Sequence, residues 1–215
     1  GRAVTRIEHD GSRRILADRF EGKKLNSPND VVVKSDGSIW FTDPTYGIDG
    51  EYEGDFAISE IGACNVYRID PVNGSVSAVI TDMVRPNGLA FSPDEKLLYV
   101  ADTGLTHKAD CSPDIRVYPV ASDGRSVGAG RRFATCDAGL FDGFRVDIHG
   151  NVWSSAADGV QCFAPDGTLI GKISIPEVVA NVCFGGVKRN RLYICGTTSL
   201  YSVYLNTQGA LRPKA

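Results

Sequence analysis

The chain has 215 residues, of which 42% are hydrophobic and 23% are charged, and its formal net charge at pH 7 is −3. This balance is typical of a globular protein with enough chain to bury a full core, and it argues against disorder. Lys and Arg are scattered, and no apolar run approaches the length of a membrane-spanning helix. We therefore expect no nucleic-acid partner and no membrane association.

The 24 glycines and 10 prolines are spread along the chain as turn residues, which favours many short strands over long helices. The six cysteines show no C-x-x-C spacing, which argues against a zinc ribbon or a thioredoxin-type site. Cys162, Cys183 and Cys195 fall in apolar strand-like runs, so we expect them to be free and buried. Pairing of Cys64 or Cys111 stays open.

A hairpin pattern recurs four times along the chain. Each copy begins at an Asn or Asp, continues with a short apolar strand, reverses at a turn rich in Asp, Gly or Pro, and returns in a second strand. The copies start at Asn29, Asn87, Asp142 and Asn181. They lie about 40 to 60 residues apart, a spacing that indicates a fold built from repeated units.

A second hairpin pattern alternates with the first. It is an apolar strand followed, in most copies, by an Asp-Gly or Asn-Gly turn. Its copies begin at Val4, Val66, Ile115, Val160 and Leu200. Two alternating hairpins make a four-stranded unit, and such a unit in repetition matches a β-propeller blade with loop insertions.

The predicted blades do not close a wide ring. Three are nearly complete, at about residues 29–80, 87–133 and 142–173, a fourth begins at Asn181, and residues 4–16 form the outer half of another. Ring closure is what removes exposed sheet edges in this all-β architecture. We therefore expect a single propeller domain over residues 1–215 that lacks an N-terminal portion.

Blade geometry places the first residue of each innermost strand on the same rim as the loop between the second and third strands. The residues expected around one mouth of the central channel are Asn29, Asn87, Asp142 and Asn181. The loops expected to overhang this mouth are 42–64, 102–114 and 155–159. The first loop is unusually long for a hairpin connection, which indicates a lid or a substrate wall.

Asn29, Asn87 and Asp142 stand in register on three different blades. Three oxygen donors at a channel mouth suit a hard divalent cation such as Ca²⁺ or Mg²⁺ better than a soft, thiolate-binding metal. Turn capping is the alternative for each residue alone, because Asn and Asp are common before strands. The shared register of all three favours a metal site.

Four ordered motifs resemble those of the gluconolactonase family, which also holds regucalcin and luciferin-regenerating enzyme. They are Leu25–Val32, Trp40–Gly47, Arg85–Asp94 and Phe141–Gly143. The resemblance extends from about Asn26 to about Cys195. It implies a six-bladed β-propeller that opens a sugar lactone or similar cyclic ester with one divalent metal ion. Calcium is the preferred ion, with magnesium, manganese and zinc as alternatives.

The resemblance implies Asn87 and Asp142 as metal ligands, and Asn29 as a ligand or a substrate contact. The metal would polarise the carbonyl, and Asp142 or a metal-bound water would supply the attack. The family's metal-binding glutamate has no match here and is expected upstream of Gly1. Ser27 stands where animal members of the family carry a substrate-contacting arginine.

Position in the rim loops adds weaker candidates. Tyr46 and His107 are predicted substrate contacts, with a solvated loop as the alternative for His107. Asp43 and Asp102 end second strands on the same rim and are alternative bases or strand-end turn caps.

Two other functions stay open at this point. The same metal site could serve phosphotriester or aryl-ester hydrolysis, and a propeller without catalytic activity could act as a binding platform. The expected partner of the favoured enzyme is a small-molecule lactone. The sequence favours a cytoplasmic location and leaves a secreted or periplasmic one open, and it does not determine the oligomeric state.

Overall fold

The computed structural model describes residues 1–210, and strands dominate it. Within this part of the chain the helical elements are two 3₁₀ turns, η1 (Tyr46–Ile48) and η2 (Gly104–Thr106). The described part of the chain divides into two compact units, residues 1–86 and residues 87–210. Among the described residues, no helix has the length and hydrophobicity to cross a membrane.

The first unit contains one four-stranded antiparallel sheet and two short hairpins. The strands of the sheet, in spatial order, are β5 (Val31–Val33), β6 (Ile39–Asp43), β7 (Asn65–Ile69) and β8 (Val76–Ile80). The hairpins pair β1 (Val4–Ile7) with β2 (Arg13–Ala17), and β3 (Arg19–Phe20) with β4 (Lys23–Lys24). The predicted blade at 29–80 and the predicted outer hairpin are confirmed. The β3–β4 hairpin was missed, because strands of two residues show no alternating pattern.

Aromatic rings form the core of the first unit. Phe41 and Tyr67 are fully buried on adjacent strands, and their rings stack with centroids 5.4 Å apart. The Phe20 ring lies 5.0 Å from the Tyr67 ring and joins the β3–β4 hairpin to the sheet. Burial of each of these side chains contributes roughly 2–3 kcal/mol.

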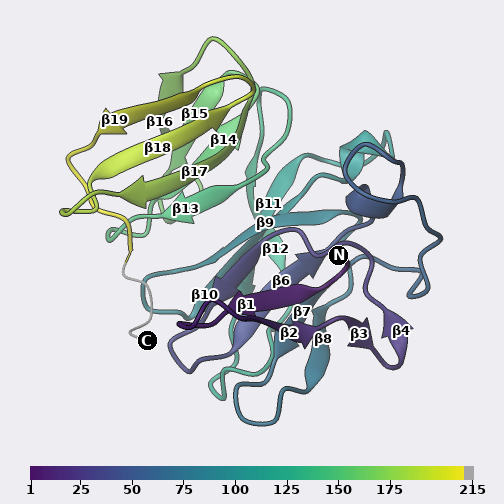
Figure 1. Cartoon of the computed structure of the whole chain (residues 1–215). Helices are drawn as coiled ribbons and strands as arrows, with labels where there is room; N and C mark the ends of the chain where they lie inside the picture. The colour runs from purple at the N-terminus through teal and green to yellow at the C-terminus, as the bar shows by residue number, and fades with distance from the viewer. Residues whose placement is uncertain (211–215) are drawn as a thin grey trace. The chain divides into compact units, whose positions relative to one another are not determined.

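The second unit contains three blade-type sheets. The first two, in spatial order, are β9 (Pro86–Phe91), β10 (Leu97–Asp102), β11 (Asp114–Pro119) and β12 (Arg131–Thr135), then β13 (Phe144–Val146), β14 (Val152–Ala156), β15 (Gly159–Phe163) and β16 (Leu169–Ser174). The third sheet has β17 (Val179–Gly185), β18 (Arg191–Gly196) and β19 (Leu200–Tyr204). In Figure 1, β17 to β19 lie beside β13 to β16. The alternating hairpins of the sequence are thus propeller blades, as predicted.

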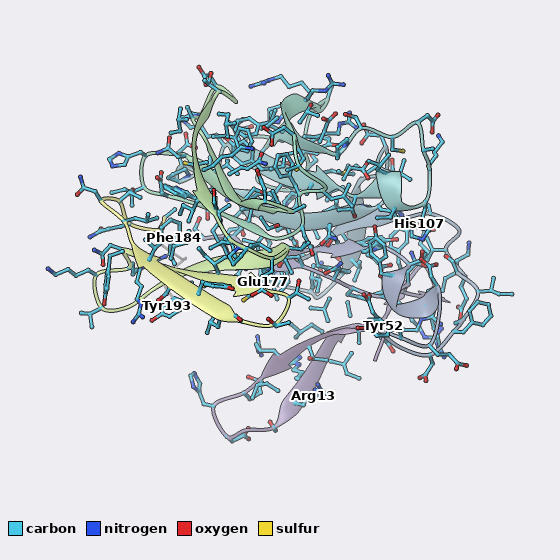
Figure 2. The ribbon with its side chains drawn as sticks, turned by 90° about the horizontal axis from the view of Figure 1, so that it is seen from above. Arg13, Tyr52, His107, Glu177, Phe184 and Tyr193 are labelled. Carbon is cyan, nitrogen blue, oxygen red and sulfur yellow. The ribbon has the colours of Figure 1, made fainter. Side chains whose placement is uncertain are left out.

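Side chains from neighbouring blades interlock in the second unit. The Phe163 ring on β15 lies 6.3 Å from Phe133 of the preceding blade, and Phe133 lies 4.8 Å from Tyr99. Trp153 meets Phe184 of the following blade edge-on at 6.3 Å. Phe184 and its neighbour Tyr193 can be seen on the last blade in Figure 2. Burial of these aromatic faces holds the three blades together.

Two expectations about details of the chain were wrong. Residues 155–159 form no overhanging loop, because β14 and β15 are joined by a tight two-residue turn at residues 157–158. All six cysteines are free, but Cys183 is only partly buried and Cys195 is exposed. The period of two in a strand directs alternate side chains to opposite faces, so an apolar run does not guarantee burial.

One buried carboxylate organises the turn between β13 and β14. Asp147 has no exposed surface and accepts hydrogen bonds from the backbone N–H groups of His149 and Asn151, both at 2.9 Å. It also accepts from Trp153 Nε1 at 3.0 Å and from Thr207 Oγ1 at 3.2 Å. The carboxylate therefore joins the third blade to the segment that follows the fourth.

Replacing this carboxylate should destabilise the protein strongly. We expect Asp147→Ala to lower the free energy of unfolding by about 3–5 kcal/mol, because several buried donors lose their acceptor together. Asp166→Ala is the control, since the exposed Asp166 accepts a single backbone hydrogen bond in the turn between β15 and β16, from Thr168 N at 2.9 Å. Its cost should stay near 1 kcal/mol or below. If urea unfolding shows the same loss of stability in Asp147→Ala and Asp166→Ala, this account is contradicted.

Candidate functional site

Asn87 and Asp142, two of the predicted metal ligands, lie at the starts of neighbouring innermost strands. Asn87 is the second residue of β9, and Asp142 directly precedes the Gly143 that leads into β13. A Cβ built on Gly88 would lie only 2.1 Å from the carbonyl oxygen of Asp142. The two backbones therefore touch at a point that only glycine permits. This contact brings together the strand starts that carry Asn87 and Asp142.

The next pair of blades repeats the arrangement. Gly143 N donates to Ala180 O at 2.9 Å, and a Cβ on Gly143 would lie 2.2 Å from Cγ of Asn181. Asn181 is the third residue of β17, so the innermost strand begins two residues before the predicted start. The Asn181 side-chain oxygen accepts a hydrogen bond from Val182 N at 2.8 Å.

Hydrogen bonds hold both Asn87 and Asp142 at the beginnings of their strands. Asn87 is 7% exposed, and its Nδ2 donates to Thr103 Oγ1 at 3.4 Å, which leaves Oδ1 as the acceptor atom. Asp142 N donates to Ser155 Oγ at 3.0 Å, which fixes the backbone of the carboxylate-bearing residue. One amide and one carboxylate oxygen fit a hard divalent cation. No group of three His, Cys, Asp or Glu suited to a metal occurs in residues 1–210, so a site here depends on asparagine.

His107 lies in the loop that begins beside Asn87. It caps η2 and is exposed, and its Nδ1 lies 2.7 Å from Thr106 Oγ1. That hydroxyl donates to Thr103 O at 2.9 Å, and Thr103 accepts from Asn87. A short chain of contacts therefore links His107 to Asn87, and its role as a substrate contact stays a prediction. Asp102 caps the same turn, because its carboxylate accepts a hydrogen bond from Gly104 N at 2.9 Å.

Asn29 lies in the first unit, on the wall of a pocket of about 550 Å³. Its side chain is exposed, and its backbone N–H donates to Thr42 O at 2.9 Å, which ties it to the second strand of its blade. Tyr46 lines the same pocket, so these two predicted substrate contacts lie together. Asn29 belongs to a different compact unit from Asn87 and Asp142, and its approach to them stays a prediction.

Comparison with known proteins identifies the family. The profile of the SMP-30/Gluconolactonase/LRE-like region matches residues 1–198. The chain belongs to this family. A gluconolactonase from Zymomonas mobilis is 36% identical to it over 97% of this chain and 59% of its own length. The chain thus spans less than two thirds of that relative.

Solved structures agree with the family and the fold. A gluconolactonase from Xanthomonas campestris has a TM-score of 0.86 and 39% identity, covering 95% of this chain and 65% of its own. The calcium-binding protein regucalcin from Agrobacterium tumefaciens has a TM-score of 0.72 at 20% identity, covering 94% of this chain and 69% of its own, and it shares the fold.

Ser27 has a role that the sequence did not reveal. Its hydroxyl donates to Pro44 O at 2.6 Å and accepts from Gly47 N at 3.0 Å. A Cβ on Gly47 would lie 2.9 Å from Ser27 Cβ, so the backbone of the long loop packs directly on the serine. In this member of the gluconolactonase family, Ser27 therefore fastens the loop at the edge of the pocket that it lines. The pattern of small residues at 27 and 47 was the available signal.

The long loop at residues 44–64 is fixed at both ends. Buried Asn26 donates to Ala63 O at 2.9 Å and accepts from Ser59 Oγ at 2.6 Å. Arg85 lies 3.6 Å from the Asp49 carboxylate, and its guanidinium lies 5.9 Å from the centre of the Tyr46 ring. Of the two predicted roles, these contacts favour a substrate wall over a mobile lid.

Asp43 is a buried carboxyl group behind this wall. Its Oδ2 accepts from Asn26 N at 2.8 Å, whereas Oδ1 has no hydrogen-bond partner among the described residues. Burial raises the pKa of Asp43 to about 7, against the opposing effect of the backbone N–H groups of Asn26 and Ser27. Its cross-strand neighbour Asn65 also has an unpaired Oδ1.

The raised pKa of Asp43 predicts a pH-dependent stability. The folded protein holds a proton that the unfolded chain, with a carboxyl pKa near 4, has released. The free energy of unfolding should therefore fall as pH rises from about 4 to about 7, by on the order of 4 kcal/mol, and level off above that. Asp43→Asn keeps the shape and does not titrate, so it should lack this slope. The free energy of unfolding is measured by urea unfolding between pH 4 and 8 for the wild-type protein and for Asp43→Asn. The same pH dependence in both proteins would refute the assignment.

The contact between Gly88 and Asp142 predicts a second effect on stability. Gly88→Ala should cost about 2–3 kcal/mol, since a Cβ forces the two strand starts apart, and should lower the Tm by roughly 5–10 °C. Gly171→Ala is the matched control, because a Cβ there meets nothing within 4 Å. Its Tm should change by less than about 2 °C. Equal melting temperatures for the two variants would contradict the close approach.

Proposed function

We propose that this protein is a metal-dependent hydrolase that opens a sugar lactone. The observation that supports the proposal is the contact between Gly88 and the Asp142 carbonyl, next to the predicted ligands Asn87 and Asp142, in a chain of the gluconolactonase family. The relatives named as gluconolactonases support the substrate class. The polar lining of the pocket around Asn29 suits a polyhydroxylated ring better than an aryl ester.

We assign the metal to Asn87 Oδ1 and the Asp142 carboxylate, with Asn29 as a third ligand. Calcium is the preferred ion because the donors are hard oxygens and because a related fold is a calcium-binding protein. Magnesium, manganese and zinc are the alternatives. When bound, the ion would polarise the lactone carbonyl and stabilise the negative charge that develops on its oxygen.

The remaining chemistry belongs to side chains of this chain. The Asp142 carboxylate takes a proton from the attacking water as the water oxygen bonds to the carbonyl carbon. The ring C–O bond then breaks, Asp142 returns the proton to the leaving ring oxygen, and the product is an open-chain hydroxy acid. Asn29 and His107 hydrogen-bond the hydroxyl groups of the substrate, and the Tyr46 ring packs against its carbon face.

Lactonase assays with metal removal test this proposal. We expect hydrolysis of glucono-1,5-lactone, followed by acid release above the spontaneous rate, to be lost in EDTA and restored by Ca²⁺. Asp142→Ala should lower kcat/KM by about 100-fold or more. Asp94→Ala, in the hairpin turn after β9, is the control and should stay within about twofold of wild type.

Each result bears on a separate part of the proposal. Activity that survives EDTA would overturn the metal, and full activity of Asp142→Ala would overturn the site. No hydrolysis of any sugar lactone by the wild-type protein would overturn the substrate class.

A further inference from the structure

Buried hydroxyl groups lie beside the strand starts that carry the predicted ligands. They belong to Thr42, Thr103 and Ser155, which are 0%, 3% and 0% exposed. Each residue lies near or just after the end of the second strand of its own blade, which is β6, β10 or β14. Burying a hydroxyl group costs free energy unless it forms a hydrogen bond. In all three blades the partner of the hydroxyl lies at the start of the innermost strand.

Ser155 holds the backbone of Asp142. Its Oγ accepts the backbone N–H of Asp142 at 3.0 Å, and its own backbone N–H donates to Gly143 O at 3.2 Å. These two bonds fix the chain on both sides of the Asp142 side chain. A backbone N–H needs an acceptor, and an alanine at position 155 would offer none to Asp142. The hydroxyl therefore restrains the direction in which the carboxylate leaves the backbone.

Thr103 holds the side chain of Asn87 instead of its backbone. Its Oγ1 accepts from Asn87 Nδ2 at 3.4 Å. The amide of asparagine has one donor end and one acceptor end, so a partner on Nδ2 determines where Oδ1 points. Thr103 is itself held in the turn η2, because its carbonyl oxygen accepts from Thr106 N at 3.1 Å and from Thr106 Oγ1 at 2.9 Å.

Thr42 makes a third contact of this kind within the first unit. Its Oγ1 accepts from Asp30 N at 3.1 Å, and its carbonyl oxygen accepts from Asn29 N at 2.9 Å. The donors in the three blades are different atoms: the N–H of a predicted ligand, the amide of a predicted ligand, and the N–H of the residue after one. One repeated turn motif does not account for them. Their common feature is a strand start that carries a predicted ligand.

We propose that Ser155 and Thr103 are positioning residues for the metal ligands Asp142 and Asn87. A cation binds more tightly to oxygen atoms that are already held in place, because fewer side-chain conformations are lost on binding. Neither hydroxyl is assigned a contact with the ion or the substrate. This inference rests on the proposed function and names residues that set the metal affinity of its site.

Calcium titration of the metal-free protein tests the role of Ser155. The dissociation constant for Ca²⁺ is measured by isothermal titration calorimetry on EDTA-treated, dialysed wild-type protein, Ser155→Ala and Ser154→Ala. Ser154 is the matched control, because it is the neighbouring residue in β14, is also 0% exposed, and donates its hydroxyl to Ser155 O at 3.3 Å. We expect calcium binding to weaken by roughly tenfold in Ser155→Ala and by less than about twofold in Ser154→Ala.

Two variants at position 103 separate the hydroxyl from side-chain packing. Thr103→Val keeps the shape and removes the hydroxyl, whereas Thr103→Ser keeps the hydroxyl and removes a methyl group. The contact with Asn87 is long for a hydrogen bond, so we expect calcium binding to weaken by only about threefold in Thr103→Val and to stay near the wild-type value in Thr103→Ser. Equal weakening in the two variants, or none in either, would overturn the role of Thr103. This comparison does not depend on the folding of Ser155→Ala.

The outcomes separate this inference from the proposed function. A wild-type protein that binds no Ca²⁺ refutes the calcium site of the proposed function, and this inference with it. A wild-type protein that binds Ca²⁺, with equal dissociation constants in Ser155→Ala and Ser154→Ala, refutes the role of Ser155 and leaves the proposed function intact.

Discussion

The close approach of neighbouring innermost strands is the constraint on which the candidate site depends. Gly88 packs against the Asp142 carbonyl, and Gly143 packs against Asn181, so each strand start supports the next. A side chain at either glycine would separate the blades where the polar residues stand. The glycine that follows Asn87 and the one that follows Asp142 therefore have the same physical reason: the backbone of the next blade comes too close for a side chain.

The long loop of the first unit also depends on small residues that let backbone segments pack closely. Ser27, Gly47 and Gly54 are small because the loop folds back on the strand start and then on itself. Asn26 and Arg85 fasten its two ends, which turns a connection of unusual length into a fixed wall. Conformational entropy lost in ordering this loop is offset by buried hydrogen bonds rather than by apolar burial alone. The same wall covers Asp43, whose raised pKa is the consequence of that burial.

Much of the fold could be predicted, because strand patterns are local. The alternation of two hairpins with Asp-Gly turns defined every blade, and the innermost position of the strands after Asn29, Asn87 and Asp142 followed from their order. The β3–β4 hairpin and the exposure of Cys195 could not be predicted. The first has too few residues for a pattern, and the second depends on which face of a strand meets the neighbouring blade.

For this protein the sequence alone determined the blade repeat, the family resemblance and the candidate ligands, since each depends on residues that lie close together in the chain. Only the tertiary structure decided that Gly88 touches the Asp142 segment, that Ser27 anchors a wall, and that Glu53 and Asp55 line the pocket of Asn29. These facts join residues far apart in the chain through backbone contacts and burial. A local sequence pattern does not predict such contacts, because they depend on how blades and loops pack in three dimensions.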